Sequence, residues 1–362
     1  MEIEALLKEY GEKIDETLER FLASTHPSST IPMYSSEFPS FHSYESDLFY
    51  NKASRFTKGP GKRIRPILSI FGYYTFDYEF PVDLTAFASL ELFHAYLLIH
   101  DDIMDKDDVR RGEPSMHRRF EAEAKGFRAP KHFGESMAII AGDILAHLGY
   151  KALLEADDFP LERRIKAAKF VTDVLLTTGY GQVIDVHTAH MNLEKRPYRS
   201  LYMLVKDVHL SKTAVYTFSG PLVFGSILAD APEIYYSRLY DAGLHAGIAF
   251  QIKDDIMGLE SPEKLLKKKN DVEEGKLTYP ILLAAQKDRS VLKHLRKRDV
   301  DKVLMIVDKT EAIKRSESDM NKHIKKAKSI LSTLDNPHVD YVNRYFLDRI
   351  SDVFDFAIKR ER

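Results

Sequence analysis

Cysteine and tryptophan are absent from the sequence, and so are the dipeptides that most strongly favour tight turns between strands. With no Cys among 362 residues, disulfides, thiolate zinc sites, iron–sulfur clusters and thiol nucleophiles are excluded. Asn-Gly, Asp-Gly and Gly-Gly, the strongest signals for a tight hairpin, never occur. Any catalysis must therefore use oxygen and nitrogen ligands, and the turns favour a helical protein.

Neither sign of charge is in clear excess, and no long apolar run is present. The 53 Lys and Arg residues nearly balance 55 Asp and Glu, which argues against a general nucleic-acid binder. No apolar stretch reaches the length of about 18 residues that a membrane span needs, and the start at Met1 lacks a basic region before an apolar one. We therefore expect a cytoplasmic protein without a transmembrane segment.

Apolar residues recur with the period of a helix along most of the chain. Residues 84–104 are apolar on nearly every side, which predicts a central buried helix. Similar buried helices are predicted at Met137–Leu154, Ala168–Thr178, Ala214–Leu228 and Ala242–Met257. An amphipathic stripe and a Pro- and Ser-rich stretch predict an N-terminal helix and arm in residues 1–45. The whole chain, 1–362, is interpreted as one all-α domain.

The most apolar of these predicted helices ends in three carboxylates. Asp101 and Asp105 are four residues apart and share one helix face, with Asp102 about 100° round the axis. The like charges repel one another, and the helix dipole disfavours anions at this end of a helix. Such a group of carboxylates needs cations.

A second acidic group has the same form, because Asp254 and Asp255 also follow an apolar helix. Two carboxylate clusters that face each other across a cavity make a site of oxygen ligands only, which suits Mg²⁺ bound also to substrate phosphate oxygens. Clustered basic groups suit phosphate as well. They are Lys62, Arg63, Arg65, Arg110, Arg111, Lys212 and Lys276. Together these residues indicate a pocket for two polyanions, one bridged by metal and one held by side chains alone.

Short motifs that contain these residues follow one another in a fixed order. They are Gly61-Lys62-x-x-Arg65-Pro66, Glu91-Leu-Phe-His94, Asp101-Asp-Ile-Met-Asp105, Arg110-Arg111-Gly112-x-Pro114, Ala141-Gly142-Asp143, Gly181-Gln182-x-x-Asp185, Lys212-Thr213, Phe250-Gln251-x-x-Asp254-Asp255 and Asp271-x-x-Glu274-Gly275-Lys276. In this series the chain resembles the trans-isoprenyl diphosphate synthases, the head-to-tail prenyltransferases that extend allylic diphosphates with isopentenyl diphosphate. The resemblance implies a helical bundle around a central cavity and a homodimer.

The resemblance also implies a role for each candidate residue. About three Mg²⁺ ions on the allylic diphosphate are implied, with Asp101, Asp102, Asp105, Asp254 and Asp255 as their ligands. The resemblance implies that Arg110, Lys212 and Lys276 stabilise the leaving diphosphate with their positive charge. It also implies that Gln182, Thr213 and Gln251 contact the allylic cation or the substrate. Binding of isopentenyl diphosphate is implied for Lys62, Arg65, His94 and Arg111.

The chain departs from the family pattern after the second acidic pair. Gly258 stands where many members have a third Asp, which weakens one expected metal contact. The segment 261–270 lacks the family's usual Gly-Lys-Pro sequence, so that Lys267, Lys268 and Lys269 remain alternative diphosphate contacts.

Product length is predicted from the residues that precede Asp101. With a rise of about 1.5 Å per residue, Tyr96 lies about 7–8 Å and Phe93 about 12 Å below Asp101. One aromatic residue at the fifth position before the motif, with Leu97 at the fourth, resembles archaeal-type geranylgeranyl synthases. A C20 product is therefore favoured, with C15 or a longer chain as the alternative, from dimethylallyl, geranyl or farnesyl diphosphate. Packing of Tyr96 in the core without such a role is the other interpretation.

Rival functions of other classes remain open. His100-Asp101 can be a metal-binding pair of a phosphohydrolase, although that hypothesis leaves the second acidic pair unexplained. A non-catalytic helical subunit of a heteromeric synthase is another hypothesis, although such a subunit is expected to lose its acidic clusters.

Overall fold

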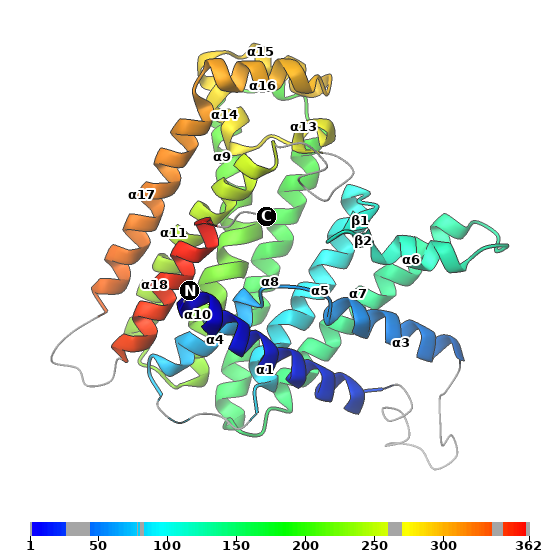
Figure 1. Ribbon diagram of the computed structural model, residues 1–362, viewed down its shortest axis with the longest axis vertical. Helices are drawn as coiled ribbons and strands as arrows, with labels where there is room; N and C mark the ends of the chain where they lie inside the picture. The colour runs from blue at the N-terminus through cyan, green and yellow to red at the C-terminus, as the bar shows by residue number, and fades with distance from the viewer. Residues whose placement is uncertain are drawn as a thin grey trace. The chain divides into compact units, whose positions relative to one another are not determined.

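The computed structural model describes residues 2–26, 44–77, 79, 83–259, 270–334 and 343–359 (Figure 1). The chain divides into two compact units. Unit 1 comprises Met1–Ile67 and Phe80–Ala168, and unit 2 comprises Leu68–Glu79 and Lys169–Arg362. Two helices, α4 (Ile64–Tyr74) and α8 (Leu161–Ala189), have residues in both units. That the units act as one domain stays a prediction.

Helices α5 and α7 form the centre of unit 1. The helices of this unit are α1 (Glu2–Ser24), α3 (Tyr44–Thr57), α5 (Thr85–Asp105), α6 (Met116–Glu123) and α7 (Pro130–Leu154), with the start of α4 and of α8. A Cβ at Gly149 of α7 would lie 2.7 Å from the ring of Phe93, and one at Gly142 would collide with the His100 imidazole. These two glycines therefore let α7 approach α5 closely.

A short β-hairpin follows α5, which the turn dipeptides did not predict. Its strands, β1 (Val109–Arg110) and β2 (Glu113–Pro114), are antiparallel, with Arg110 opposite Glu113. The two residues between them, Arg111 and Gly112, both have positive φ, 55° and 78°. Two successive residues in this region make the turn that matches strand twist. The absence of Asn-Gly, Asp-Gly and Gly-Gly therefore did not exclude a tight hairpin, because Arg111 adopts the conformation that Asn or Asp usually takes.

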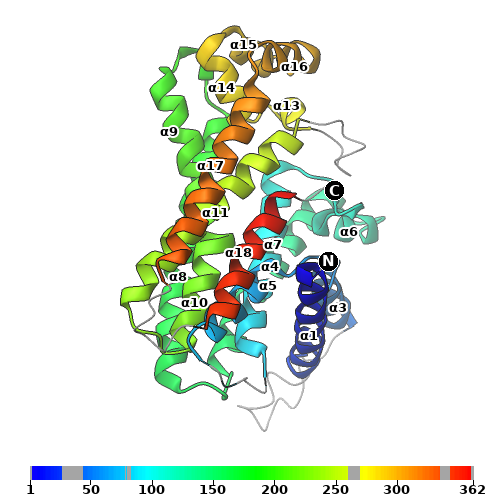
Figure 2. The same ribbon diagram turned by 60° about the vertical axis from the view of Figure 1, so that its left-hand side comes forward.

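Unit 2 is built around α11. Its elements are η2 (Leu193–Lys195), α9 (Tyr198–Val208), η3 (His209–Ser219), α10 (Gly220–Leu228), α11 (Ile234–Met257), α13 (Asp271–Glu274), α14 (Tyr279–Lys287), α15 (Ser290–Arg296), α16 (Val300–Lys309), α17 (Ala312–Ser332) and α18 (Arg344–Lys359), with most of α8. Figure 2 shows α17 and α18 beside α11, and both helices pack on it. On another face, a Cβ at Gly247 would lie 2.6 Å from the Ala214 Cβ, so only glycine permits this contact with η3.

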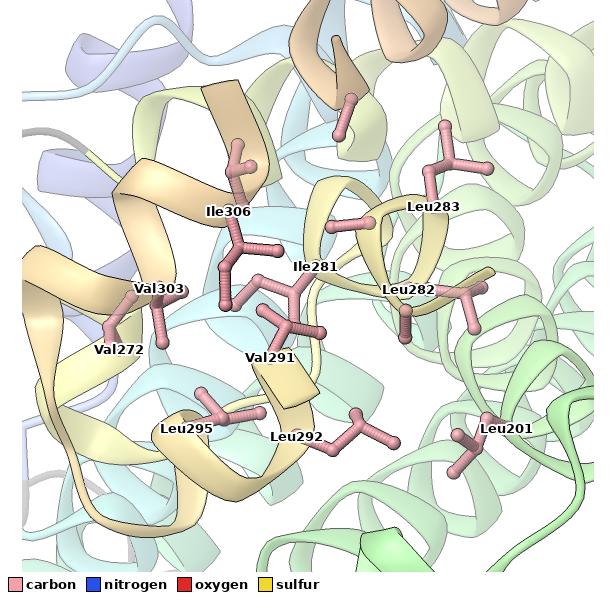
Figure 3. Packing of buried hydrophobic residues seen from close by; sticks show 14 of the residues in the cluster. Leu201, Val272, Ile281, Leu282, Leu283, Val291, Leu292, Leu295, Val303 and Ile306 are labelled. Atoms are coloured by element: carbon pink, nitrogen blue, oxygen red, sulfur yellow. The ribbon is translucent and has the colours of Figure 1, made fainter. Parts of the chain in front are cut away.

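An apolar cluster holds α13 and α14 in place within unit 2. In Figure 3, Ile281 and Leu282 of α14 pack with Val291 and Leu292 of α15, and all four are at most 1% exposed. Val272 of α13 belongs to the same cluster and is fully buried. Burial of one such side chain stabilises the fold by about 1.5–3 kcal/mol. The segment between α13 and α14, residues 275–278, is therefore anchored at both ends.

The predicted all-α class is confirmed, whereas the predicted burial of two helices was wrong in part. On α7, Ile140 is 48% exposed, and on α8, Leu176 is 54% exposed. Apolar residues on these helices occur on outward faces as well as inward ones. Within the described residues, α7 is also long and apolar enough to cross a membrane, with 44% of its most apolar window buried. Since buried helices of soluble proteins meet the same criterion, this is weak evidence for a span.

A pair of histidines between α11 and α17 predicts acid sensitivity of unit 2. The Nδ1 atoms of His245 and His323 lie 2.8 Å apart. Burial, and then the neighbouring His245, lowers the pKa of His323 to about 4, and burial also lowers the pKa of His245. The unfolded chain therefore takes up protons before the folded chain as the pH falls. The nearby charged groups are Asp319, Lys322, His209, Asp241 and Lys326.

We expect the free energy of unfolding to fall by about 1–2 kcal/mol between pH 6.5 and pH 4, after allowance for solvent screening of this partly exposed pair. The stabilisation by neutral His323 is fully present above pH 6.5 and is lost as the pH approaches 4. His323→Gln should flatten this part of the pH profile in denaturant titrations. His190→Gln, at an exposed histidine, is the matched control, and equal profiles for both variants would contradict the prediction.

Candidate active site

The end of α5 separates its three carboxylates. Lys106 adopts the left-handed conformation, φ 59°, and ends the helix directly after Asp105. The Asp101 side chain is 21% exposed, whereas that of Asp102 is fully buried. Asp101 and Asp105 share a face of the helix and are both partly exposed, while Asp102 points into the protein.

Arg110 binds the buried carboxylate. Its Nε donates to Asp102 Oδ1 over 2.7 Å, its Nη2 contacts the same oxygen, and Asp101 Oδ2 lies 3.9 Å away. Burial raises the pKa of Asp102 to about 6, although Arg110 opposes this shift. Burial disfavours the charge of Arg110, but Asp102 and Asp101 more than offset this and raise the pKa of Arg110. Arg110 thus fixes the hairpin to the end of α5.

The donor set at this helix end fits a hard divalent cation that shares its ligands with a bound anion. Asp102 Oδ2 is buried and has no hydrogen-bond partner. Among the described residues, no three His, Asp or Glu side chains are arranged to hold a metal by themselves. Mg²⁺ is commonly bound by one or two carboxylates together with waters and substrate phosphates. Carboxylates from Asp101 and Asp105 match that requirement. The role of Asp102 as a metal ligand stays a prediction, since Arg110 holds its Oδ1.

A buried arginine fixes the glycine-rich loop that carries Lys62. Arg63 Nε donates to Asp15 Oδ1 of α1 over 2.7 Å, Nη1 to Glu91 Oε2 of α5 over 2.9 Å, and Nη2 to the Gly59 carbonyl over 2.8 Å. Its side chain is 2% exposed and its φ is 49°. Burial disfavours the charge, but the two carboxylates outweigh burial and raise the pKa of Arg63. The sequence motifs assign no separate role to Arg63.

His94 lies in a basic environment. Burial, and then the positive charges of Arg65 and Arg111, hold the pKa of His94 well below its ordinary value. The imidazole is therefore neutral at neutral pH and can donate one hydrogen bond without charge. Lys62 is exposed and Arg65 half-buried. Unit 1 thus brings His94 together with arginines predicted to bind isopentenyl diphosphate.

The three residues predicted to set product length differ in burial. Phe93 is fully buried and meets the ring of Tyr150 edge-on at 4.9 Å between centroids. Tyr96 is half-buried and contacts the His100 ring, also at 4.9 Å. Burial, and then Asp143, raises the pKa of Tyr96. Leu97 is likewise half-buried. Tyr96 and Leu97 are therefore more accessible than Phe93.

In unit 2, Asp255 is held by three hydrogen bonds. His209 Nε2 lies 2.9 Å and the Tyr279 backbone nitrogen 2.7 Å from its Oδ2, and Gln251 Nε2 donates to Oδ1 over 2.8 Å. The Asp255 side chain is 7% exposed, whereas Asp254 is half-buried. Asp255 therefore anchors α11 to η3 and α14, and its predicted metal contact stays a prediction.

The remaining predicted residues of unit 2 make separate polar contacts. Lys212 Nζ donates to Asp185 Oδ2 over 2.7 Å, and Thr213 Oγ1 donates to Gln251 Oε1 over 2.6 Å. Gln182 follows Gly181, where a Cβ would lie 2.7 Å from the Lys212 nitrogen, so α8 approaches η3 closely here. Lys276 pairs with Glu274 at 2.8 Å. The Thr213 contact therefore joins η3 to the helix that carries Asp254.

A family model described as polyprenyl synthetase matches residues 46–313. The chain belongs to the polyprenyl synthetase family. It is 32% identical over 231 residues to the geranylgeranyl diphosphate synthase of Sulfolobus acidocaldarius, covering 63% of each chain. It is also 32% identical over 232 residues to the farnesyl diphosphate synthase of Bacillus subtilis, covering 62% of this chain and 72% of that one. The match thus spans less than two thirds of the Sulfolobus relative.

Solved structures of two geranylgeranyl pyrophosphate synthases share the fold over nearly the whole chain. A geranylgeranyl pyrophosphate synthase from Corynebacterium glutamicum, complexed with isoprenyl diphosphate and magnesium, has a TM-score of 0.82 at 24% identity, covering 98% of this chain and 99% of that one. That of Pyrococcus horikoshii has a TM-score of 0.78 at 24% identity, covering 99% of both chains. Family membership confirms the predicted resemblance, and these structures confirm the predicted fold.

Some predictions about this polyprenyl synthetase are not tested by the structure. Two predictions involve both units and stay predictions: that the two acidic clusters face each other, and that a central cavity lies between them. Lys267, Lys268 and Lys269 lie outside the described residues, as does the arm in residues 27–43.

The departure at Gly258 has a structural reason. A Cβ at this position would collide with the carboxylate of Asp271, whose backbone nitrogen donates to the Gly258 carbonyl over 3.0 Å. Asp271 therefore places a carboxylate directly against the site where many polyprenyl synthetases have their third Asp. The space is filled from α13 instead of α11.

Proposed function

We propose that this chain condenses isopentenyl diphosphate with an allylic diphosphate in a Mg²⁺-dependent reaction. The observation that carries the proposal is the difference among the carboxylates at the end of α5. Asp101 and Asp105 are partly exposed, whereas Asp102 is buried and binds Arg110. Accessible carboxylates beside a fixed arginine suit a metal-bound diphosphate. The geranylgeranyl and farnesyl diphosphate synthases among the relatives support the same reaction.

In the proposed reaction, the allylic carbon–oxygen bond breaks and the diphosphate leaves with both bonding electrons. When bound, Mg²⁺ supplies Lewis acidity that stabilises the leaving diphosphate. Arg110, Lys212 and Lys276 add positive charge to the same group, and this preorganised charge lowers the barrier. Asp101, Asp102, Asp105, Asp254 and Asp255 are the proposed metal ligands, for about three ions.

The second substrate forms the new bond. Isopentenyl diphosphate, bound by Lys62, Arg65, His94 and Arg111, donates its double-bond electrons to the allylic cation, and a carbon–carbon bond forms. Gln182 and Thr213 are proposed to lie beside that cation in a pocket that excludes water. One proton then leaves the new chain for a diphosphate oxygen, which completes the balance of atoms and charge.

Incubation with Mg²⁺, labelled isopentenyl diphosphate and each allylic primer, followed by sizing of the products, tests the proposal. Chain extension from dimethylallyl, geranyl or farnesyl diphosphate is the expected result. Release of phosphate without extension would instead favour a phosphohydrolase, and no reaction with any primer would favour a non-catalytic subunit.

We propose geranylgeranyl diphosphate, C20, as the main product, with farnesyl diphosphate, C15, as the alternative. Tyr96 is expected to limit the chain, because it lies one to two turns before Asp101 and is more accessible than Phe93. Tyr96→Ala should shift the main product upward by at least one C5 unit on reversed-phase chromatography. Phe120→Leu, at a buried aromatic residue of α6 that is not among the predicted chain-length residues, is the control and should keep the parent's product lengths. Unchanged product lengths for Tyr96→Ala would exclude this role.

A homodimer and a cytoplasmic location are part of the proposal. Exposed apolar side chains occur on one face of α7, at Ile140 and Ile144, and of α8, at Leu176, Tyr180 and Val183. Apolar patches of this kind are typical of association surfaces. The mass of the purified chain by sedimentation, and cell fractionation, test the two statements.

A further inference from the structure

Unit 1 contains a cavity whose lining includes several basic side chains that were not predicted to bind isopentenyl diphosphate. Its volume is about 390 Å³, and it lies between the end of α3, the loop after it and the β1–β2 hairpin. The charged side chains of its lining are Arg55, Lys58, Arg110, Arg111, Glu113 and Arg119. Five of these side chains are cationic and one is anionic, so the cavity favours an anion.

One polar face of α3 forms a wall of this cavity. Asn51, Ser54 and Arg55 of α3, and Lys58 directly after its end, follow the spacing i, i+3, i+4 and i+7, which places them along one side of the helix. Phe56, between them in sequence, is 8% exposed and belongs to the core. The amide, hydroxyl and basic groups of this face are all able to donate hydrogen bonds to an oxyanion.

Two of the arginines in the cavity, Arg55 and Arg111, form no ion pair with any residue that the structure describes, although Glu91 acts on Arg111 electrostatically. Arg110 is bound to Asp102, Arg119 to Glu113, and Lys58 to Glu19. In the part of the chain that the structure describes, Arg55 and Arg111 make no hydrogen bond or ion pair. Their guanidinium groups can therefore donate two parallel hydrogen bonds to the oxygens of a phosphate group.

The cavity adjoins the loop that was predicted to bind isopentenyl diphosphate. A Cβ at Gly61 would lie 3.4 Å from Arg111 Nη2, so Arg111 borders both the loop and the cavity. Glycine at 61 keeps this approach open. An anion in the cavity would thus share Arg111 with the Lys62 loop.

We propose that Arg55 is a further substrate-binding residue, which together with Arg111 binds the diphosphate of isopentenyl diphosphate at this cavity. The identity of the ligand rests on the proposed function, whereas the preference for a diphosphate anion rests on the cavity itself. Arg55 lies outside the basic loop and the Arg110-Arg111 pair. It adds a cation from α3 that none of the motifs in the sequence contains.

Steady-state kinetics with a saturating allylic primer test the assignment. Arg55→Gln should raise KM for isopentenyl diphosphate about tenfold, because a charge-assisted contact is lost, while kcat and KM for the primer stay within twofold. Arg55→Lys should give an intermediate KM, since a lysine keeps the charge without the two-point contact. Arg128→Gln removes the same charge from an exposed position of unit 1 outside the cavity and should match the parent.

Calorimetry with inorganic pyrophosphate in metal-free buffer supplies a readout that needs no turnover. Arg55→Gln should weaken pyrophosphate binding about tenfold, and Arg128→Gln should not. Equal results for the two variants in either experiment would overturn the proposal, because a direct contact must affect both substrate and pyrophosphate. If the parent chain forms no product yet loses pyrophosphate affinity on Arg55→Gln, the proposed function fails while the anion site stands, and the ligand assignment is overturned.

Discussion

Replacement of Arg63 by methionine is expected to lower the free energy of unfolding by about 3–5 kcal/mol. The guanidinium joins α1, α5 and the loop that carries Lys62, through Asp15, Glu91 and the Gly59 carbonyl. The Glu91 side chain is 5% exposed, so removal of its partner leaves a buried carboxylate without compensation. Denaturant titration followed by circular dichroism measures the change.

The matched control is Arg20→Met, which removes an arginine of α1 whose ion pair with Asp83 is largely exposed. An exposed pair contributes about 0–1 kcal/mol, so this variant should unfold almost like the parent. Arg63→Met should also raise KM for isopentenyl diphosphate, since Lys62 loses its fixed support. Equal unfolding free energies for the two methionine variants would show that Arg63 does not hold the loop.

Asp101→Asn is expected to lower kcat/KM by about 10²–10³-fold, because a proposed metal ligand becomes neutral and charge on the leaving diphosphate is less well stabilised. Its unfolding free energy should change by less than about 0.5 kcal/mol, since the side chain is partly exposed and its nearest cation, Arg110, keeps Asp102. Product formation over a range of Mg²⁺ concentrations, with a parallel denaturant titration, measures both.

Comparison of Asp102→Asn with Asp101→Asn separates a structural role of the carboxylate from a role as metal ligand alone. Because Asp102 is buried and bound by Arg110, this variant should lose stability as well as activity. Asp301→Asn, at an exposed position of α16, controls for the loss of one negative charge. Full activity of Asp101→Asn at all Mg²⁺ concentrations would exclude Asp101 as a metal ligand.

Helix periodicity predicted the positions of the first acidic cluster well, because local spacing determines which residues of α5 share a face. It also predicted the N-terminal helix and the central position of α5. It could not distinguish Asp102 from Asp101, since that difference depends on Arg110, which the hairpin brings back to the helix end eight residues later. The hairpin itself gave no dipeptide signal.

The supports of the site were missed because they come from distant parts of the chain. Asp255 is bound by His209, 46 residues away, and by the Tyr279 nitrogen, 24 residues away. Arg63 is bound by Asp15, 48 residues away. Neither pairing follows from local pattern, and the family motif contains no position for His209. The one signal for Arg63 was its place beside Lys62 in a basic loop, which also fits an ordinary exposed residue.

In the turn of the hairpin, the backbone conformation of Arg111 favours glycine, whereas the cavity needs the arginine side chain. Arg111 has φ 55°, a conformation that costs a residue with a Cβ about 1–2 kcal/mol and costs glycine almost nothing. Selection for folding alone would therefore drive this position toward glycine, whereas a guanidinium at the cavity requires the more strained residue. Thermostability screens that ignore turnover should thus enrich changes here that impair the enzyme.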